Sequence, residues 1–162
     1  MVKILSSNAV KEIESIAANY KDQPEQLMSI LLDIQNIASN GFSKEVAEIV
    51  GNTTGIPESQ IYDYITFYQM FSTKPRGKYI IRMCKSAPCM ICGSQEIMDA
   101  VCDTLQIKPG ETTKDGMFTL EFCECIGLCD ESPAVMINDE AYTDLTVDKI
   151  KEILLQYQKG VV

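Results

Sequence analysis

The sequence predicts an α/β protein in which a small helical bundle, residues 1–75, precedes a compact α/β domain, residues 76–162. Apolar residues recur with a helical period in the first part, whereas short apolar runs between turn residues indicate strands in the second part. All seven cysteines lie after residue 83. The segment Lys74-Pro75-Arg76-Gly77 combines proline and glycine, so we expect the boundary there.

Four short helices are expected in the first part. The first is an amphipathic stretch, and Pro24 suits the opening turn of the second, which we expect to end at Gly41. Ser43 is a candidate N-cap for the third, with Gly51 as its end, and Pro57 opens the fourth. The apolar residues with helical period are Val10, Ile13, Ile16 and Ala17, then Leu27, Ile30, Leu31, Ile34 and Ile37, then Val46, Ala47, Ile49 and Val50, then Ile61, Tyr62, Ile65 and Phe67.

The second part alternates strands and helices. Strands are expected over 79–83, 117–123, 134–137 and near Tyr142, with a hairpin turn at Asn138-Asp139. Helices are expected over 93–105 and after Thr146, which caps a helix that Gly160 ends. This order, β-α-β-β-β-α, resembles thioredoxin. Cysteine loops follow the carboxyl ends of the first two strands, where open α/β sheets tend to place their sites.

Composition excludes several classes of partner. The net charge is −9, and neither part is basic: residues 1–75 carry 5 basic and 9 acidic side chains, and residues 76–162 carry 9 and 14. The fourth helix carries Glu58, Gln60 and Asp63 and no basic residue, which argues against nucleic acid. Polar residues follow the first five, and no apolar run is long enough to span a membrane. We therefore expect a cytoplasmic chain with reduced cysteines that bind metal or do redox chemistry.

Four cysteines form two pairs by spacing: Cys84-x4-Cys89 and Cys125-x3-Cys129. Soft thiolate ligands select zinc, copper(I) or iron–sulfur clusters. A 2Fe–2S cluster needs two thiolates on each iron, which two such loops would supply. The same spacings also admit a structural zinc site with four thiolates.

The other cysteines keep alternatives open. Cys89-x2-Cys92 before a helix has the spacing of dithiol oxidoreductases, in which the helix dipole lowers the pKa of the attacking thiol. Cys84, Cys89 and Cys92 with Cys123 would satisfy the plant-type ferredoxin spacing. Because Cys123 lies in or at the end of a strand, the two loops are the favoured ligand source, and Cys92 and Cys123 become neighbours of the ligands or core residues. Cys102 belongs to the apolar face of a helix, so it is expected in the core.

At these residues the chain resembles the thioredoxin-like 2Fe–2S subunit shared by complex I (NADH:quinone oxidoreductase), electron-bifurcating hydrogenases and some NAD-dependent formate dehydrogenases. The resemblance covers nearly the whole chain. The segments that carry it are Gly41-Phe42, Gly55-Ile56-Pro57, Thr66-Phe67-Tyr68-Gln69-Met70-Phe71, Lys74-Pro75-Arg76-Gly77-Lys78, Cys84-x4-Cys89 and Glu124-Cys125-Ile126-Gly127-Leu128-Cys129 followed by Pro133.

The resemblance implies an electron carrier, not a catalyst. Its ligands would be Cys84, Cys89, Cys125 and Cys129, holding one 2Fe–2S cluster. It further implies a flavoprotein partner that binds FMN and NAD(H), with other iron–sulfur or hydrogenase subunits beyond it. The chain itself has no histidine, no Gly-x-Gly-x-x-Gly loop and no Walker A sequence, so nucleotide chemistry is expected on another chain.

Overall fold

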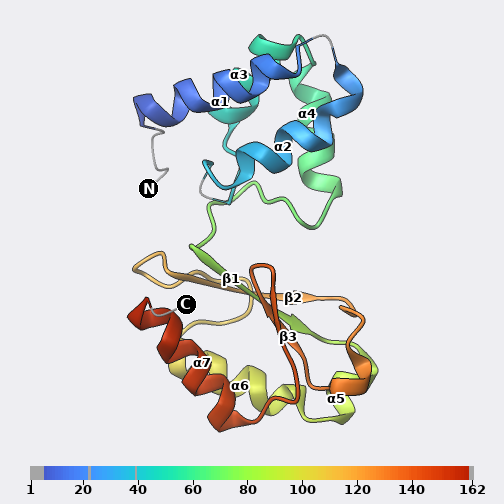
Figure 1. Cartoon of the computed structure of the whole chain (residues 1–162), viewed down its shortest axis with the longest axis vertical. Helices are drawn as coiled ribbons and strands as arrows, with labels where there is room; N and C mark the ends of the chain where they lie inside the picture. Colours follow the sequence, from blue (N-terminus) through green and yellow to red (C-terminus); the bar gives the residue numbers. More distant parts are fainter. Residues whose placement is uncertain (1–5, 22, 39, 161–162) are drawn as a thin grey trace. The chain divides into compact units, whose positions relative to one another are not determined.

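A computed structural model describes residues 6–21, 23–38 and 40–160. The chain divides into two compact units, one ending at Arg76 and the other beginning at Gly77. The first unit contains helices α1 (Ser7–Asn19), α2 (Leu27–Gln35), α3 (Lys44–Thr54) and α4 (Glu58–Phe67), with a short 3₁₀ turn η1 (Pro24–Gln26) before α2 (Figure 1). The predicted class, helices followed by a mixed α/β domain, is confirmed.

The apolar faces of these helices form one core. Ile13 of α1, Ile30 and Ile34 of α2, Val50 of α3 and Ile61 of α4 are fully shielded from solvent or nearly so. Since an isolated helix of about ten residues is marginal in water, this shared burial is what stabilises the unit. Ser43 caps α3 as predicted, because its side chain accepts a hydrogen bond from the N–H of Val46 at 3.3 Å.

Two helix ends differ from the prediction. Helix α2 stops at Gln35, before Gly41, and α3 continues through Gly51 to end at Gly55. Gly55 has the left-handed conformation, φ 78°, that a helix C-terminus requires, whereas Gly51 is an interior helical residue. Glycine is needed at position 41 for a different reason, because a Cβ there would lie 2.2 Å from the carbonyl oxygen of Lys74. Glycine is needed at that position for close backbone approach, not as a helix stop.

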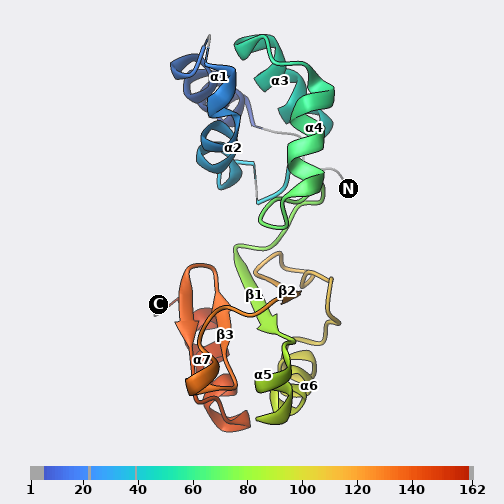
Figure 2. The ribbon, with the colours of Figure 1, turned by 90° about the vertical axis from the view of Figure 1, so that its right-hand side faces the viewer.

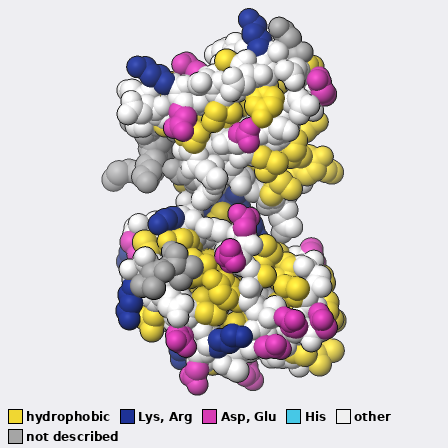
Figure 3. All heavy atoms as spheres, in the orientation of Figure 1, with side chains coloured by type: hydrophobic (Ala, Val, Ile, Leu, Met, Phe, Trp, Pro, Cys, Tyr) yellow, Lys and Arg dark blue, Asp and Glu magenta, His cyan; other side chains and the backbone are white. Residues whose placement is uncertain are grey.

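Apolar side chains remain exposed on α4 (Figure 3). Phe67 is 80% exposed and Tyr62 is 58% exposed, while Tyr68 packs edge-on against Phe67. The neighbouring Phe71 is buried against Phe42 in the core. The aromatic run at the end of α4 is therefore divided between core and surface.

The second unit is built on a four-stranded mixed sheet of order β2-β1-β3-β4 (Figures 1 and 2). Its elements are β1 (Tyr79–Cys84), α5 (Ala87–Ile91), α6 (Ser94–Leu105), β2 (Phe118–Cys123), η2 (Cys129–Glu131), β3 (Val135–Ile137), β4 (Glu140–Tyr142) and α7 (Val147–Lys159). Strands β1 and β2 are parallel, and β3 is antiparallel to both β1 and β4. The short helix α5 is an addition to the predicted order.

Alternate residues of the strands point to one face and pack under α6 and α7. Ile81 of β1, Leu120 of β2 and Ile137 of β3 lie in one buried core with Val101 of α6 and Ile150 of α7. The period of two along a strand then places the intervening residues, which include the last residue of β1 and of β2, on the opposite face. The predicted hairpin turn is present, and Asn138 supplies the positive φ, 53°, that glycine usually provides.

Candidate metal centre

Both predicted cysteine loops leave the same edge of the sheet. Strands β1 and β2 are parallel and in register, so that Cys84, the last residue of β1, lies beside Cys123, the last residue of β2. The carboxyl ends of parallel strands meet at one edge, which is where the sequence placed the site. Within the described part of the chain, no helix is long and apolar enough to cross a membrane.

The first loop carries two buried thiols. Cys84 and Cys89 are each 2% exposed. Cys89 lies within the five-residue helix α5, which begins after Ser86 and carries Pro88 in its first turn. Proline is favoured in the first turn because the N–H that proline lacks would have no hydrogen-bond partner within the helix at that position. The sequence signal for α5 was therefore present in Ser86-Ala-Pro, although the helix is too short to show a period.

The second loop carries two exposed thiols that already form a pair. The sulfur atoms of Cys125 and Cys129 are 3.2 Å apart, and the N–H of Gly127 donates to the sulfur of Cys125 at 3.4 Å. Gly127 has φ 87°, a left-handed conformation that lets the loop turn back on itself. The turn that this glycine makes is the reason the two thiols of this loop meet.

Contacts join the two loops. The sulfur of Cys89 lies 3.6 Å from the hydroxyl oxygen of Ser132, three residues after Cys129. The hydrogen bond to Cys125 raises the pKa of Cys129 to about 11, and the negative charges of Cys89 and Cys84 add to the shift. The four predicted residues thus form two pairs, Cys84 with Cys89 in one buried group and Cys125 with Cys129 on the loop that Ser132 follows. Among the described residues, no three His, Cys, Asp or Glu side chains converge to hold a single metal ion.

Hydrogen-bond donors surround the sulfur of Cys84. Burial opposes its ionisation, but the backbone N–H groups of Ser86 and Ile126 and the side chains of Cys89 and Ser86 more than offset burial, so the pKa of Cys84 is lowered. Donors to a thiolate favour its charged form, which is the form that binds metal. Ser86 and the backbone N–H groups of Ile126 and Gly127 are therefore the donors to sulfur in the two loops.

The remaining cysteines have different environments. Cys123 is buried in a contact group with Cys84, Cys89 and Ala134, and burial followed by the nearby Cys84 raises its pKa to about 11. Cys102 is half-buried and packs against the core under α6, as predicted, and burial raises its pKa. Cys92 is exposed at the C-terminal end of α5, so it is not a core residue.

Two ion pairs bridge β1 and β2 next to the cysteines. Lys85 contacts Glu124 at 2.9 Å, and Arg82 approaches Glu121 at 3.9 Å. Lys85 follows Cys84 and Glu124 follows Cys123, so the parallel register makes them opposite each other. The pair is largely exposed and contributes little stability, but it links the starts of the two cysteine loops. The sequence alone does not predict this ion pair, because the pairing of Lys85 with Glu124 depends on the register of β1 and β2.

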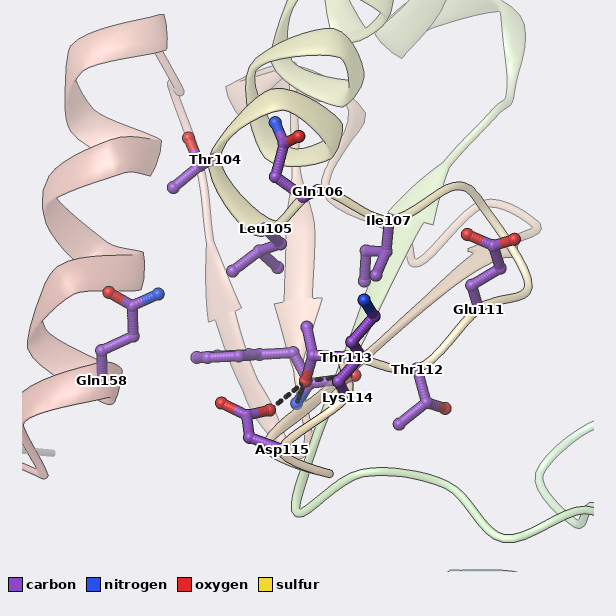
Figure 4. A pocket seen from close by; sticks show the side chains of 11 residues that line it. Thr104, Leu105, Gln106, Ile107, Glu111, Thr112, Thr113, Lys114, Asp115 and Gln158 are labelled. Carbon is purple, nitrogen blue, oxygen red and sulfur yellow. Dashed lines mark hydrogen bonds between the residues drawn. The ribbon is translucent and has the colours of Figure 1, made fainter.

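A separate open pocket of about 870 Å³ lies in the second unit (Figure 4). It is lined by the end of α6, the segment 106–115 and Gln158 of α7. Thr113 and Asp115 are hydrogen-bonded to each other at its floor. Because this segment precedes β2 and the cysteine loop follows β2, the pocket lies at the opposite end of that strand. No cysteine lines it, so it is not part of the predicted site.

Comparisons with known proteins agree with the fold. The family described as thioredoxin-like [2Fe-2S] ferredoxin matches residues 13–158. A NADH-quinone oxidoreductase subunit of Rhizobium meliloti (strain 1021) is 32% identical over 148 residues, covering 91% of this chain and 88% of the relative. A NADH-quinone oxidoreductase subunit of Rickettsia prowazekii (strain Madrid E) is 40% identical over 148 residues, covering 89% and 82%.

The fold also resembles part of a solved structure. A chain of the NAD+-reducing [NiFe]-hydrogenase in the air-oxidized state superimposes with a TM-score of 0.74 at 20% identity over 85% of this chain. The likeness spans only 23% of that hydrogenase chain, and at this identity it shows the fold alone. The family match, by contrast, includes both cysteine loops and most of the helical unit. The chain belongs to the thioredoxin-like [2Fe-2S] ferredoxin family, which implies a 2Fe–2S cluster and an electron-transfer role.

Proposed function

We propose that this chain is an electron-transfer subunit that holds one 2Fe–2S cluster through Cys84, Cys89, Cys125 and Cys129. The observation that carries the proposal is the arrangement of these thiols as two pairs at the carboxyl ends of adjacent parallel strands. Each iron of such a cluster takes two thiolates, so the donor set fits the group in number and in chemistry.

The residues around the pairs suit the same role. Such a cluster supplies one-electron transfer, and its potential depends on burial and on hydrogen bonds to sulfur. One pair of thiols is buried and the other is exposed, which supports electron exchange through the Cys125–Cys129 side. Ser86, Ile126 and Gly127 donate to sulfur.

We further propose that the chain works in a multisubunit NAD(H)-linked oxidoreductase, docked on a subunit that binds FMN and NAD. Support comes from the relatives named as subunits of NADH-quinone oxidoreductase, which match most of this chain and of their own length. The chain's own residues supply ligands for a cluster and no nucleotide-binding loop, so the hydride chemistry belongs to the partner. Complex I and an NAD-reducing hydrogenase are the two assemblies that this proposal covers.

The experiment is anaerobic purification of the full chain, followed by iron, zinc and acid-labile sulfide analysis. The proposal expects a red-brown protein with two irons and two sulfides per chain, because that is the composition of one such cluster. Colourless protein with one zinc per chain would overturn it.

A second experiment tests the partner. A tagged chain purified from its source is expected to bring down a subunit that contains FMN and oxidises NADH; recovery of the chain alone would contradict the proposed partner.

The dithiol alternative is less well supported by the geometry. An attacking thiol must be accessible and is usually activated at a helix N-terminus. Cys89 is 2% exposed within α5, and Cys92 lies at the C-terminal end of that helix. We therefore do not assign exchange chemistry to this pair.

A further inference from the structure

Cys123 is a buried thiol beside the proposed ligands. It is the last residue of β2 and the register partner of Cys84 in parallel β1. Residues in register on parallel strands point to the same face, and neighbouring strands are about 4.8 Å apart. The side chains of Cys84 and Cys123 therefore lie together on the face opposite α6 and α7, and both are buried.

The surroundings of Cys123 confirm this placement. It belongs to a compact buried group with Cys84, Cys89 and Ala134, against which Ile126 and Leu128 of the second cysteine loop pack. This group is distinct from the core under α6 that Cys102 contacts. The thiol of Cys123 thus lies on the same side of the site as the buried thiols of Cys84 and Cys89.

We propose that Cys123 is a reserve ligand that can replace Cys84 or Cys89 in holding the 2Fe–2S cluster. The inference rests on the proposed function, since it needs a cluster to be bound. When Cys84 is absent, Cys89 and Cys123 would form the buried pair, since Cys123 is the register partner of Cys84 on a strand about 4.8 Å away. In that case the Fe–S bond to Cys84 never forms, an Fe–S bond to Cys123 would form in its place, and the S–H bond of Cys123 would break with its proton passing to solvent; no electron is transferred.

The exposed side of the site has no such reserve. Cys102 is a partly buried residue of α6 that packs against the core, and Cys92 is exposed at the end of α5. The chain is therefore expected to keep a cluster when Cys84 is replaced and to lose it when Cys129 is replaced.

The test compares Cys84→Ala, the double variant Cys84→Ala/Cys123→Ala and the matched control Cys84→Ala/Cys102→Ala, each purified anaerobically as the full chain. The readouts are iron and sulfide per chain and the electron paramagnetic resonance spectrum after reduction. Cys84→Ala and the control are expected to keep at least about half of the wild-type iron and sulfide, with an altered spectrum. The double variant Cys84→Ala/Cys123→Ala is expected to keep less than about a tenth of the wild-type iron and sulfide. Equal loss in all three variants overturns the inference, and so does retention in the Cys123 double variant.

Two further comparisons keep the outcome unambiguous. If Cys84→Ala does not fold by circular dichroism, the same series on Cys89→Ala decides, because Cys84 and Cys123 would then form the pair. Wild-type protein without iron would contradict the proposed function itself, whereas loaded wild type with empty Cys84→Ala contradicts only the reserve-ligand inference.

Discussion

At the residue scale, the site is defined by which groups donate to sulfur. The thiol of Cys84 receives donors from Ser86 and Ile126, and Cys125 receives the N–H of Gly127. Reduction adds negative charge to a cluster and to its thiolate ligands, so each donor stabilises the reduced state more than the oxidised state. Donors at these positions therefore raise the reduction potential.

Replacing Ser86 by alanine tests one donor. The Ser86→Ala variant is expected to lower the potential by roughly 40 mV, since a net hydrogen bond is worth about 1 kcal/mol and, for one electron, about 1.4 kcal/mol corresponds to 59 mV. A redox titration followed by electron paramagnetic resonance measures the shift. Ser59→Ala on the exposed surface of α4 is the matched control. The same potential in both variants would show that the Ser86 hydroxyl does not affect the reduction potential.

At the element scale, the sequence predicted what local patterns encode. Helical period located all four helices of the first unit, and side-chain caps at Ser43 and Thr146 were correct because capping is a local interaction. Gly41 and Gly51 were misassigned, since the need for glycine at Gly41 comes from Lys74, more than thirty residues away. The grouping of Cys123 with Cys84 likewise depends on strand register, which one sequence does not reveal.

The close approach at Gly41 gives a stability prediction. In Gly41→Ala the new Cβ would overlap the carbonyl of Lys74, so backbone must shift, and the first unit should lose about 1–3 kcal/mol of folding free energy. Thermal unfolding monitored by circular dichroism measures the loss. Asn52→Ala, at an exposed position within α3, is the control and should change stability little; a wild-type melting temperature in Gly41→Ala would contradict the packing described.

The start of β1 gives a second prediction. A Cβ at Gly77 would lie 2.8 Å from the backbone of Phe118, at the end of the β1–β2 ladder away from the cysteines. Gly77→Ala should therefore disturb the strand pairing that aligns Cys84 with Cys123, lowering both the melting temperature of the second unit and its iron content. Full iron content with an unchanged melting temperature would show that this contact does not control the register.

At the scale of the whole molecule, each unit buries its own apolar core. The first core is formed by α1 to α4 and the second by the sheet with α6 and α7. The four proposed ligands belong to the second unit alone. Since metal binding contributes folding free energy to the structure that holds it, the cluster should stabilise the second unit selectively.

Removing the cluster tests this separation. Treatment with an iron chelator under oxidising conditions is expected to reduce amide hydrogen-exchange protection at the ends of β1 and β2 and in their loops. Protection in α1 to α4 should stay the same, because their core contains no ligand. Comparable loss of protection in both units would contradict the assignment of cluster stabilisation to the second unit.

The central claim is that two pairs of cysteines hold one cluster, and the exposed pair tests it most directly. Iron and acid-labile sulfide are measured in Cys129→Ala beside Cys102→Ala, both purified anaerobically. Cys102→Ala should retain two irons and two sulfides per chain, because Cys102 is a partly buried residue of α6 that packs against the core and away from both cysteine loops. Cys129→Ala should retain neither. A fully loaded Cys129→Ala protein, or an empty Cys102→Ala protein that still folds, would contradict the ligand set.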